Sequence, residues 1–149
     1  MSLSDTAENL LIDFLFRRQP LGLAGSTGLG PASLYIALLT SAPDDFGAGD
    51  EVTGAGYERA PIECSLTAWS ATQGGTSVSS GSSGKTANNV PIVFRAPAAD
   101  WGVVVAYAVH DQPVGGKRLF ASMLTAPRTI MAGDDGPQFP SGSLTFTLS

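Results

Sequence analysis

Cysteine and histidine are nearly absent from this sequence, since Cys64 and His110 are the single examples of each. One cysteine excludes an internal disulfide and any site built from several thiolates, and one histidine excludes the usual His-rich zinc sites. Charged residues are also few, at 14% of the chain against roughly 25% in an average soluble protein. We therefore expect no metal or other cofactor, and we expect part of the apolar surface to contact partner proteins.

Positive charge and long hydrophobic runs are scarce as well. The chain has 8 Lys and Arg against 13 Asp and Glu, and no basic run is longer than the pair Arg17-Arg18, so no nucleic-acid partner is expected. No apolar run reaches the ~18 residues of a membrane-spanning helix, so no membrane partner is expected. Asp5 and Glu8 stand where a secretion signal would carry positive charge, which predicts synthesis without export.

What is present is a chain of 149 residues, 43% of them hydrophobic. This is the length of one ordinary domain and is short for two. A domain of this length buries roughly 70% of the surface that its unfolded chain exposes, so it can form a core without disulfides or metals. We therefore predict a single domain, 1–149.

The clearest helical pattern covers residues 4–18. Asp5 and Glu8 have the spacing of a capping box, and Pro20 ends the pattern. Apolar residues surround much of the helix, and such a helix is usually buried on more than one side. We therefore predict that one side contacts a neighbouring subunit. The predicted interface residues are four from this helix and a tryptophan expected to act as a core or interface anchor: Leu11, Ile12, Leu15, Phe16 and Trp101.

Short β-branched or aromatic runs, separated by Gly, Pro, Asp and Ser, follow residue 20. They predict strands at 34–40, 64–69, 90–94, 103–109, 119–124, 129–131 and 144–148. Short strands with turns between them favour a sandwich or barrel. We predict a mainly β fold, a single β-sandwich of jelly-roll or immunoglobulin-like type with one N-terminal α-helix. Residues 112–116 are expected to form a hairpin loop, and the Ser- and Gly-rich residues 72–89 a long loop.

Two motifs resemble catalytic or nucleotide-binding sites but lack required features. Residues 81–86 end in Gly-Lys-Thr as a P-loop does, but Ser79 stands where the first glycine belongs and no helix is predicted to follow. His110 and Asp111 could be combined with Cys64 or a serine into a triad, but the chain has no Gly-x-Ser-x-Gly nucleophile elbow. We therefore predict no catalytic residues and no enzyme activity.

Acidic residues gather in two predicted loops, Asp44, Asp45, Asp50 and Glu51 in one and Asp134-Asp135 in the other. Oxygen ligands in irregular loops can bind calcium, although the spacing is not that of an EF-hand. Acidic residues also cap turns and keep loops solvated. The sequence leaves both interpretations open.

A series of short motifs runs through the chain, at 34–38 (Leu-Tyr-Ile-Ala-Leu), 49–59, 92–94, 99–102, 124–127, 132–134 and 142–146. In their order and spacing they resemble a family of small phage virion proteins, usually labelled tail fibre or tail proteins. The resemblance covers nearly the whole chain, including the N-terminal helix. It implies a structural role in a phage particle and brings no catalytic motif.

We therefore expect a structural component of a phage virion, assembled in the bacterial host cytoplasm. It would be a tail-fibre or tail-associated subunit that forms homo-oligomers and contacts other virion proteins. One alternative is a head decoration or cement protein. An alternative of another class is a carbohydrate- or receptor-binding module, in which Trp69, Trp101 or Tyr107 would expose a ring for stacking.

Overall fold

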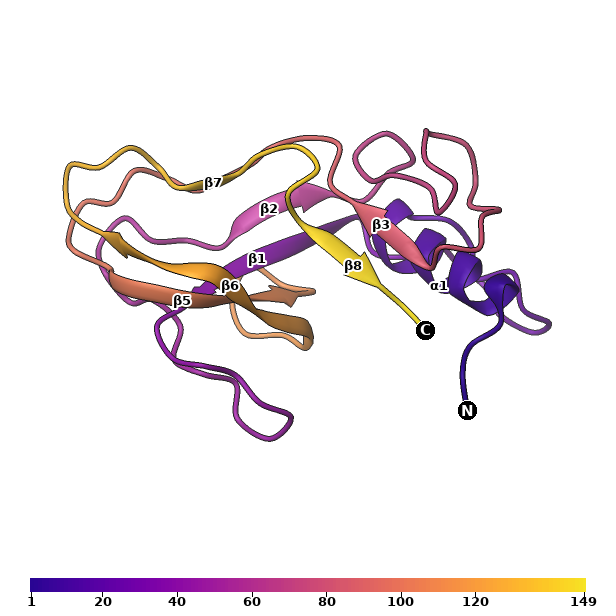
Figure 1. The fold of residues 1–149 in the computed structure, drawn as a ribbon, viewed down its shortest axis with the longest axis horizontal. Helices are drawn as coiled ribbons and strands as arrows, with labels where there is room; N and C mark the ends of the chain where they lie inside the picture. Colours follow the sequence, from indigo (N-terminus) through magenta and orange to yellow (C-terminus); the bar gives the residue numbers. More distant parts are fainter. The chain divides into compact units, whose positions relative to one another are not determined.

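The computed structural model describes all residues from Met1 to Ser149. The chain is mainly β with one N-terminal helix, as the sequence predicts (Figure 1). Its residues form two compact units, each assembled from segments far apart in the sequence. Unit 1 comprises residues 1–33, 63–92 and 139–149, and unit 2 comprises residues 34–62 and 93–138. That residues 1–149 fold as a single domain stays a prediction.

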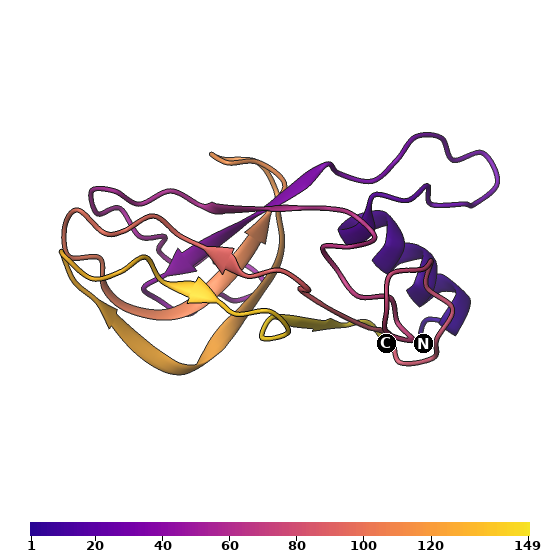
Figure 2. The ribbon, with the colours of Figure 1, turned by 90° about the horizontal axis from the view of Figure 1, so that it is seen from above.

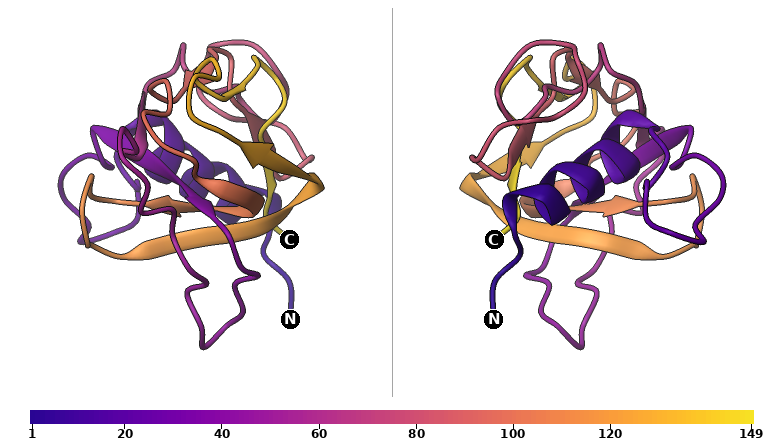
Figure 3. Two further views of the ribbon diagram at one scale, coloured as in Figure 1. Left: turned by 90° about the vertical axis from the view of Figure 1, so that its left-hand side faces the viewer. Right: turned by 90° about the vertical axis from the view of Figure 1, so that its right-hand side faces the viewer.

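Unit 1 contains the helix α1 (Asp5–Arg17), which the right-hand view of Figure 3 shows along its length. Its N-cap is Ser4, whose Oγ accepts a hydrogen bond from the backbone N–H of Ala7 at 3.2 Å. Asp5 and Glu8 lie in the first turn, where negative charge favours the helix dipole. The helix ends at Arg18, which adopts a left-handed conformation with φ 55°.

The core of unit 1 is a cluster of three aromatic rings. Phe16 of α1 lies 4.9 Å from Trp69 and 4.9 Å from Phe146, measured between ring centroids. Phe146 belongs to β8 (Thr145–Thr147), which pairs antiparallel with β3 (Lys85–Ala87). Strand β3 lies inside the Ser- and Gly-rich segment 72–89, which otherwise consists of turns and loops.

Unit 2 is built on a four-stranded sheet in the order β2-β1-β5-β6. Its strands are β1 (Ser33–Leu39), β2 (Ala60–Glu63), β5 (Gly102–His110) and β6 (Arg118–Ile130). Both β1 and β6 run antiparallel to β5. Figure 2 shows that the long β6 ribbon, in orange, is strongly curved. The predicted hairpin loop joins β5 to β6 and is closed by Asp111, whose Oδ1 accepts from the Lys117 N–H at 2.7 Å.

The predicted single β-sandwich is not confirmed, because the sheets are small and none closes. Besides the four-stranded sheet there are two sheets of two strands, β3-β8 and β4-β7, the latter formed by β4 (Ile92–Val93) and β7 (Gln138–Phe139). The strand predicted at 64–69 is wrong, since this segment forms a turn. Its Ser65 Oγ accepts from the Ala68 N–H at 3.0 Å, a local bond that competes with strand pairing.

Candidate functional site

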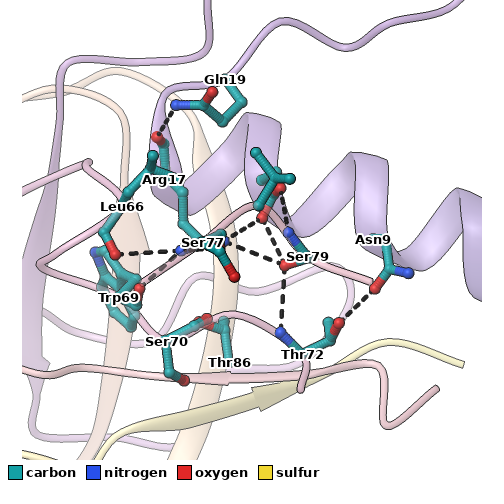
Figure 4. A network of polar contacts seen from close by, with 12 residues as sticks. Asn9, Arg17, Gln19, Leu66, Trp69, Ser70, Thr72, Ser77, Ser79 and Thr86 are labelled. Atoms are coloured by element: carbon teal, nitrogen blue, oxygen red, sulfur yellow. Dashed lines mark hydrogen bonds and ion pairs between the residues drawn. The ribbon is translucent and has the colours of Figure 1, made fainter. Parts of the chain in front are cut away.

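The Ser- and Gly-rich segment is held against α1 by one buried arginine, Arg17, which has no exposed surface (Figure 4). Its Nε donates to the Trp69 carbonyl at 3.0 Å, and one terminal nitrogen donates to the Ser77 carbonyl at 2.7 Å. The other terminal nitrogen donates to Asp13 at 2.7 Å. Asp13 in turn accepts from the N–H of Ser79 at 2.8 Å and from its hydroxyl at 2.6 Å. The network fixes the conformation of the segment.

The P-loop-like residues 81–86 lie in this fixed segment. The Asn9 side-chain amide donates to the Gly81 carbonyl at 3.0 Å, and the Gly81 N–H donates to the Thr72 hydroxyl at 2.8 Å. Lys85 begins strand β3 rather than a helix. The segment therefore lacks the helix N-terminus on which a P-loop binds phosphate, and its serines bind other parts of unit 1.

Three of the predicted interface residues are core residues of their own units. Ile12 and Phe16 have no exposed surface, and Trp101 is 4% exposed and donates from Nε1 to the Ala55 carbonyl at 3.1 Å. Phe16 is buried inside unit 1, where its ring packs against those of Trp69 and Phe146. Leu11 and Leu15 are only half-buried, so of the four predicted helix residues these two remain available for a partner.

Burial also removes the aromatic stacking platforms considered above. Trp69 has no exposed surface, Trp101 is 4% exposed and Tyr107 is 8% exposed. A sugar ring needs an accessible aromatic face to stack on. A carbohydrate- or receptor-binding site built on these three rings is therefore wrong for this fold.

The residues considered for a catalytic triad are placed for structural roles. Burial raises the pKa of the Cys64 thiol to about 12, so it is protonated at neutral pH, and it donates to the Leu15 carbonyl at 3.6 Å. Burial and the nearby Arg59 guanidinium lower the pKa of His110 below 6.5, which keeps the ring neutral. Asp111 closes the β5–β6 hairpin. None of these groups carries the activation that a nucleophile requires.

The acidic loops use their carboxylates to hold backbone conformation. Asp44 Oδ1 accepts from the N–H groups of Phe46 and Gly47, and these bonds lower the pKa of Asp44. Asp134 Oδ2 accepts from the Met131 N–H at 2.9 Å. No group of three or more His, Cys, Asp or Glu side chains is arranged to hold a metal ion. The calcium interpretation thus gains no ligand set.

A polar cluster of unit 2 joins Glu51, Tyr57 and Arg59. Arg59 forms a bidentate pair with Glu51, at 3.0 Å from Nε to Oε2 and 2.9 Å from Nη2 to Oε1. The Tyr57 hydroxyl donates to Glu51 at 2.6 Å and accepts from the N–H of Leu38 in β1 at 3.1 Å. The cluster borders a groove of about 440 Å³, whose other walls are Val52, Glu58, Pro113, Val114 and Gly115.

The same arginine fixes the β5–β6 hairpin loop beside the groove. Its Nη1 donates to the carbonyls of Gln112 and Gly115, at 2.9 and 2.7 Å. Arg118 does the same for the loop before Asp50, donating to the carbonyls of Asp44 and Gly47 at 2.7 and 3.1 Å. These loops carry two fully exposed apolar side chains, Phe46 (103% exposed) and Val114 (86% exposed). Sequence reasoning missed Tyr57 and Arg59 as partners of Glu51, although all three occur in the 49–59 motif.

Replacing Tyr57 with Phe is expected to lower the free energy of unfolding by about 1–3 kcal/mol, because both Glu51 and the Leu38 N–H lose a hydrogen-bond partner. Urea denaturation followed by circular dichroism measures the change. Tyr35→Phe is the matched control, since Tyr35 is a half-buried tyrosine of β1 whose hydroxyl has no hydrogen bond in the structure. Equal effects of the two changes would contradict the role assigned to the Tyr57 hydroxyl.

The lowered pKa of Glu51 predicts that the protein loses stability in acid. Burial raises the pKa of Glu51, but the hydrogen bonds from Arg59 and Tyr57 outweigh burial, and the pKa lies below its usual 4.5. A carboxylate whose pKa is lowered by folding stabilises the fold above its unfolded pKa, and this contribution is lost as the pH falls through the folded value. The free energy of unfolding should therefore fall below about pH 4.5, and less steeply in Glu51→Gln.

Urea titrations between neutral pH and about pH 3 test this expectation. Glu58→Gln is the matched control, because the Glu58–Arg95 pair is exposed, with relative side-chain exposures of 63% and 72%, and contributes little. A Glu51→Gln variant with the acid dependence of the original chain would contradict the prediction.

The structure contains no helix with the length and hydrophobicity needed to cross a membrane. Its polar clusters hold loops in place rather than activate a reacting group, and apolar side chains project from the loop ends and from β6. Such a chain has the character of a β-rich structural protein that works through its surface.

Comparison with known proteins identifies the family. The family model described as podophage GP4 fiber I protein gp80 matches residues 2–147, and a search of curated proteins found no match. The chain belongs to this podophage fiber family. It is accordingly a phage virion component of the tail-fibre kind that associates with other virion proteins, which confirms the family resemblance predicted from the sequence.

Proposed function

We propose that the chain is a tail-fibre or tail-associated structural subunit that acts through homo-oligomerisation, with no enzymatic role. The observation that carries the proposal is the family match across residues 2–147. Assembly takes place in the host cytoplasm, and the partners are further copies of the chain and other virion proteins. Neither nucleic acid nor a membrane is a partner, in keeping with the net charge of −5 and the small number of basic residues.

The contacts between copies involve the half-buried helix residues Leu11 and Leu15 and the edges of the sheets. Leu11 and Leu15 are spaced by one helical turn and therefore lie on the same face of α1. An apolar face of this kind is suited to packing against an apolar surface of another subunit. Ile12 and Phe16 have no exposed surface and support this face of α1 from inside rather than contacting the partner.

Light scattering coupled to size-exclusion chromatography tests the oligomerisation. We expect a mass of at least twice the 15.3 kDa of one chain, and a monomer at high protein concentration would overturn this part of the proposal. Immunogold labelling of intact particles tests the location. Labelling at the tail supports the fibre role, whereas labelling over the head would favour the decoration or cement alternative.

A further inference from the structure

Strand β6 forms one edge of the four-stranded sheet and pairs with β5 only. It has 13 residues, and the consecutive residues Ala121, Ser122 and Met123 are all exposed. Successive side chains of a strand point to opposite faces of the sheet. Both faces of β6 are therefore uncovered around Ser122, in addition to its free edge.

Only part of this edge is open to another strand. Residues 124–127 lie opposite the single residue Val105, because the pairing changes from Val104–Arg128 to Ala106–Met123. Irregular pairing, a proline and a charged side chain are features that prevent an edge strand from pairing with another strand. This part of β6 has all three, since it also contains Pro127 and Arg128. Residues 120–123, here called the open segment, pair regularly with β5 and contain neither charge nor proline.

The apolar face of the sheet continues onto the open segment. Ala37, Ala108 and Ala121 form one row across three strands, and Leu39, Ala106 and Met123 form the next. The four residues on β1 and β5 are at most 2% exposed and form a core cluster. The β6 members of both rows are exposed, and Met123 reaches 52%. The apolar face of the sheet, which is buried on β1 and β5, thus continues onto β6, where it is exposed.

We propose that residues 121–123 of the open segment pair antiparallel with the same residues of a second copy of this chain, about a two-fold axis at Ser122. The proposal rests on the proposed homo-oligomerisation and names the surface that carries it. A strand edge presents N–H and C=O groups that another extended strand can satisfy. A two-fold axis uses the same surface of both copies, so each open segment covers the other.

The charge pattern of β6 is compatible with a second copy in this register. Ala121 lies opposite Met123 of the second copy, which continues both apolar rows. Arg118 lies opposite Ala126, and Arg128 lies opposite Gly116, so no two like charges face each other. Since like charges directly opposite are destabilising in a strand pair, this register avoids the main electrostatic penalty of self-pairing.

Charge exchange at the two row residues tests the pairing. In Ala121→Lys/Met123→Lys, and likewise in Ala121→Glu/Met123→Glu, like charges face each other twice across the axis. Each double variant alone should dimerise with a Kd raised by about a hundredfold or more, and an equimolar mixture should regain dimers by pairing Lys with Glu. The matched control is Thr129→Lys/Met131→Lys, two exposed residues outside the open segment that lie opposite Gly115 and Pro113 in this register and so face no charge, and it should leave the dimer intact.

A disulfide tests the register. Ser122→Cys places two thiols opposite each other at the axis, where the Cα separation of an antiparallel pair suits a disulfide. Oxidation should yield a covalent dimer for Ser122→Cys and none for Thr129→Cys, since the natural Cys64 is buried and does not compete. Circular dichroism confirms that each variant is folded.

The outcomes separate this inference from the proposed function. Loss of dimers in each charged variant and their return in the mixture support the β6 pairing. If both charged variants still form the same oligomers as the wild-type chain, the β6 pairing is overturned while homo-oligomerisation stands. The same follows if the Ser122→Cys chain dimerises without cross-linking. A monomeric wild-type chain overturns homo-oligomerisation itself.

Discussion

Arg17→Ala is expected to lower the free energy of unfolding by about 3–5 kcal/mol, the range found when one partner of a buried ion pair is removed. Asp13 would remain as a buried carboxylate without its cation, and the side chain of Asp13 is only 9% exposed. The carbonyls of Trp69, Leu66 and Ser77 would lose their donor as well. The Ser- and Gly-rich segment would therefore lose part of its attachment to α1 and keep only the hydrogen bonds to Asn9 and Asp13.

Chemical denaturation followed by circular dichroism measures this loss. Arg17→Lys keeps the charge but offers no planar fork, so it should recover only part of the lost stability. Arg128→Ala is the control, because Arg128 is an exposed arginine and its truncation should change the free energy of unfolding by less than about 0.5 kcal/mol. Equal stability of the Arg17→Ala and Arg128→Ala chains would contradict the role of the network.

Faster proteolysis within the segment provides a second readout. Residues 72–84 contain many Gly and Ser and are fixed mainly through side-chain hydrogen bonds to unit 1, including those of Asn9 and Asp13. Loops without such attachments are preferred sites of cleavage. Arg17→Ala should therefore be cut in this segment sooner than the original chain under native conditions, which mass spectrometry of the fragments would detect.

Phe16→Ala is expected to have a comparable effect, a loss of about 3–5 kcal/mol in the free energy of unfolding. Phe16 has no exposed surface, and its ring packs against both Trp69 and Phe146 at centroid distances of 4.9 Å. Truncation removes buried apolar surface and leaves a cavity among rings that cannot close around it. The helix would lose the contact of Phe16 with Phe146 of β8.

Phe46→Ala is the matched control for this change, because the substitution is identical and the Phe46 side chain is fully exposed. It should leave the free energy of unfolding within about 0.5 kcal/mol of the original value. Thermal and urea denaturation of the two variants give the comparison. A Phe16→Ala chain as stable as Phe46→Ala would show that the aromatic cluster does not hold unit 1 together.

The sequence by itself determined the features that depend on local chemistry. The apolar spacing and Pro20 define a helix at 4–18, and the structure has it at Asp5–Arg17, with Ser4 rather than Asp5 as the N-cap. The turn residues 112–116 define a hairpin, and the structure closes this hairpin through Asp111. The order of the short motifs indicated the phage fibre family, which the match over residues 2–147 confirms.

Long-range packing decided what local patterns could not. Residues 64–69 have the composition of a strand, yet the Ser65 hydroxyl bonds to the Ala68 N–H and the segment turns so that Trp69 enters the aromatic core. The runs 119–124 and 129–131 looked like two strands, but both pair with β5 and form one strand around an irregularity. Such outcomes depend on partners far away in the sequence.

The predicted interface residues also show which features follow from the sequence and which from tertiary packing. The sequence identified an apolar excess on α1, but which of its residues face the core depends on where Trp69 and Phe146 lie. Likewise, the sequence shows Arg17 only as part of a short basic pair, because nothing local reveals that it contacts carbonyls some 50 to 60 residues away. Local propensities determined the elements of this protein, and burial and hydrogen bonding between distant segments decided which surfaces were left for its partners.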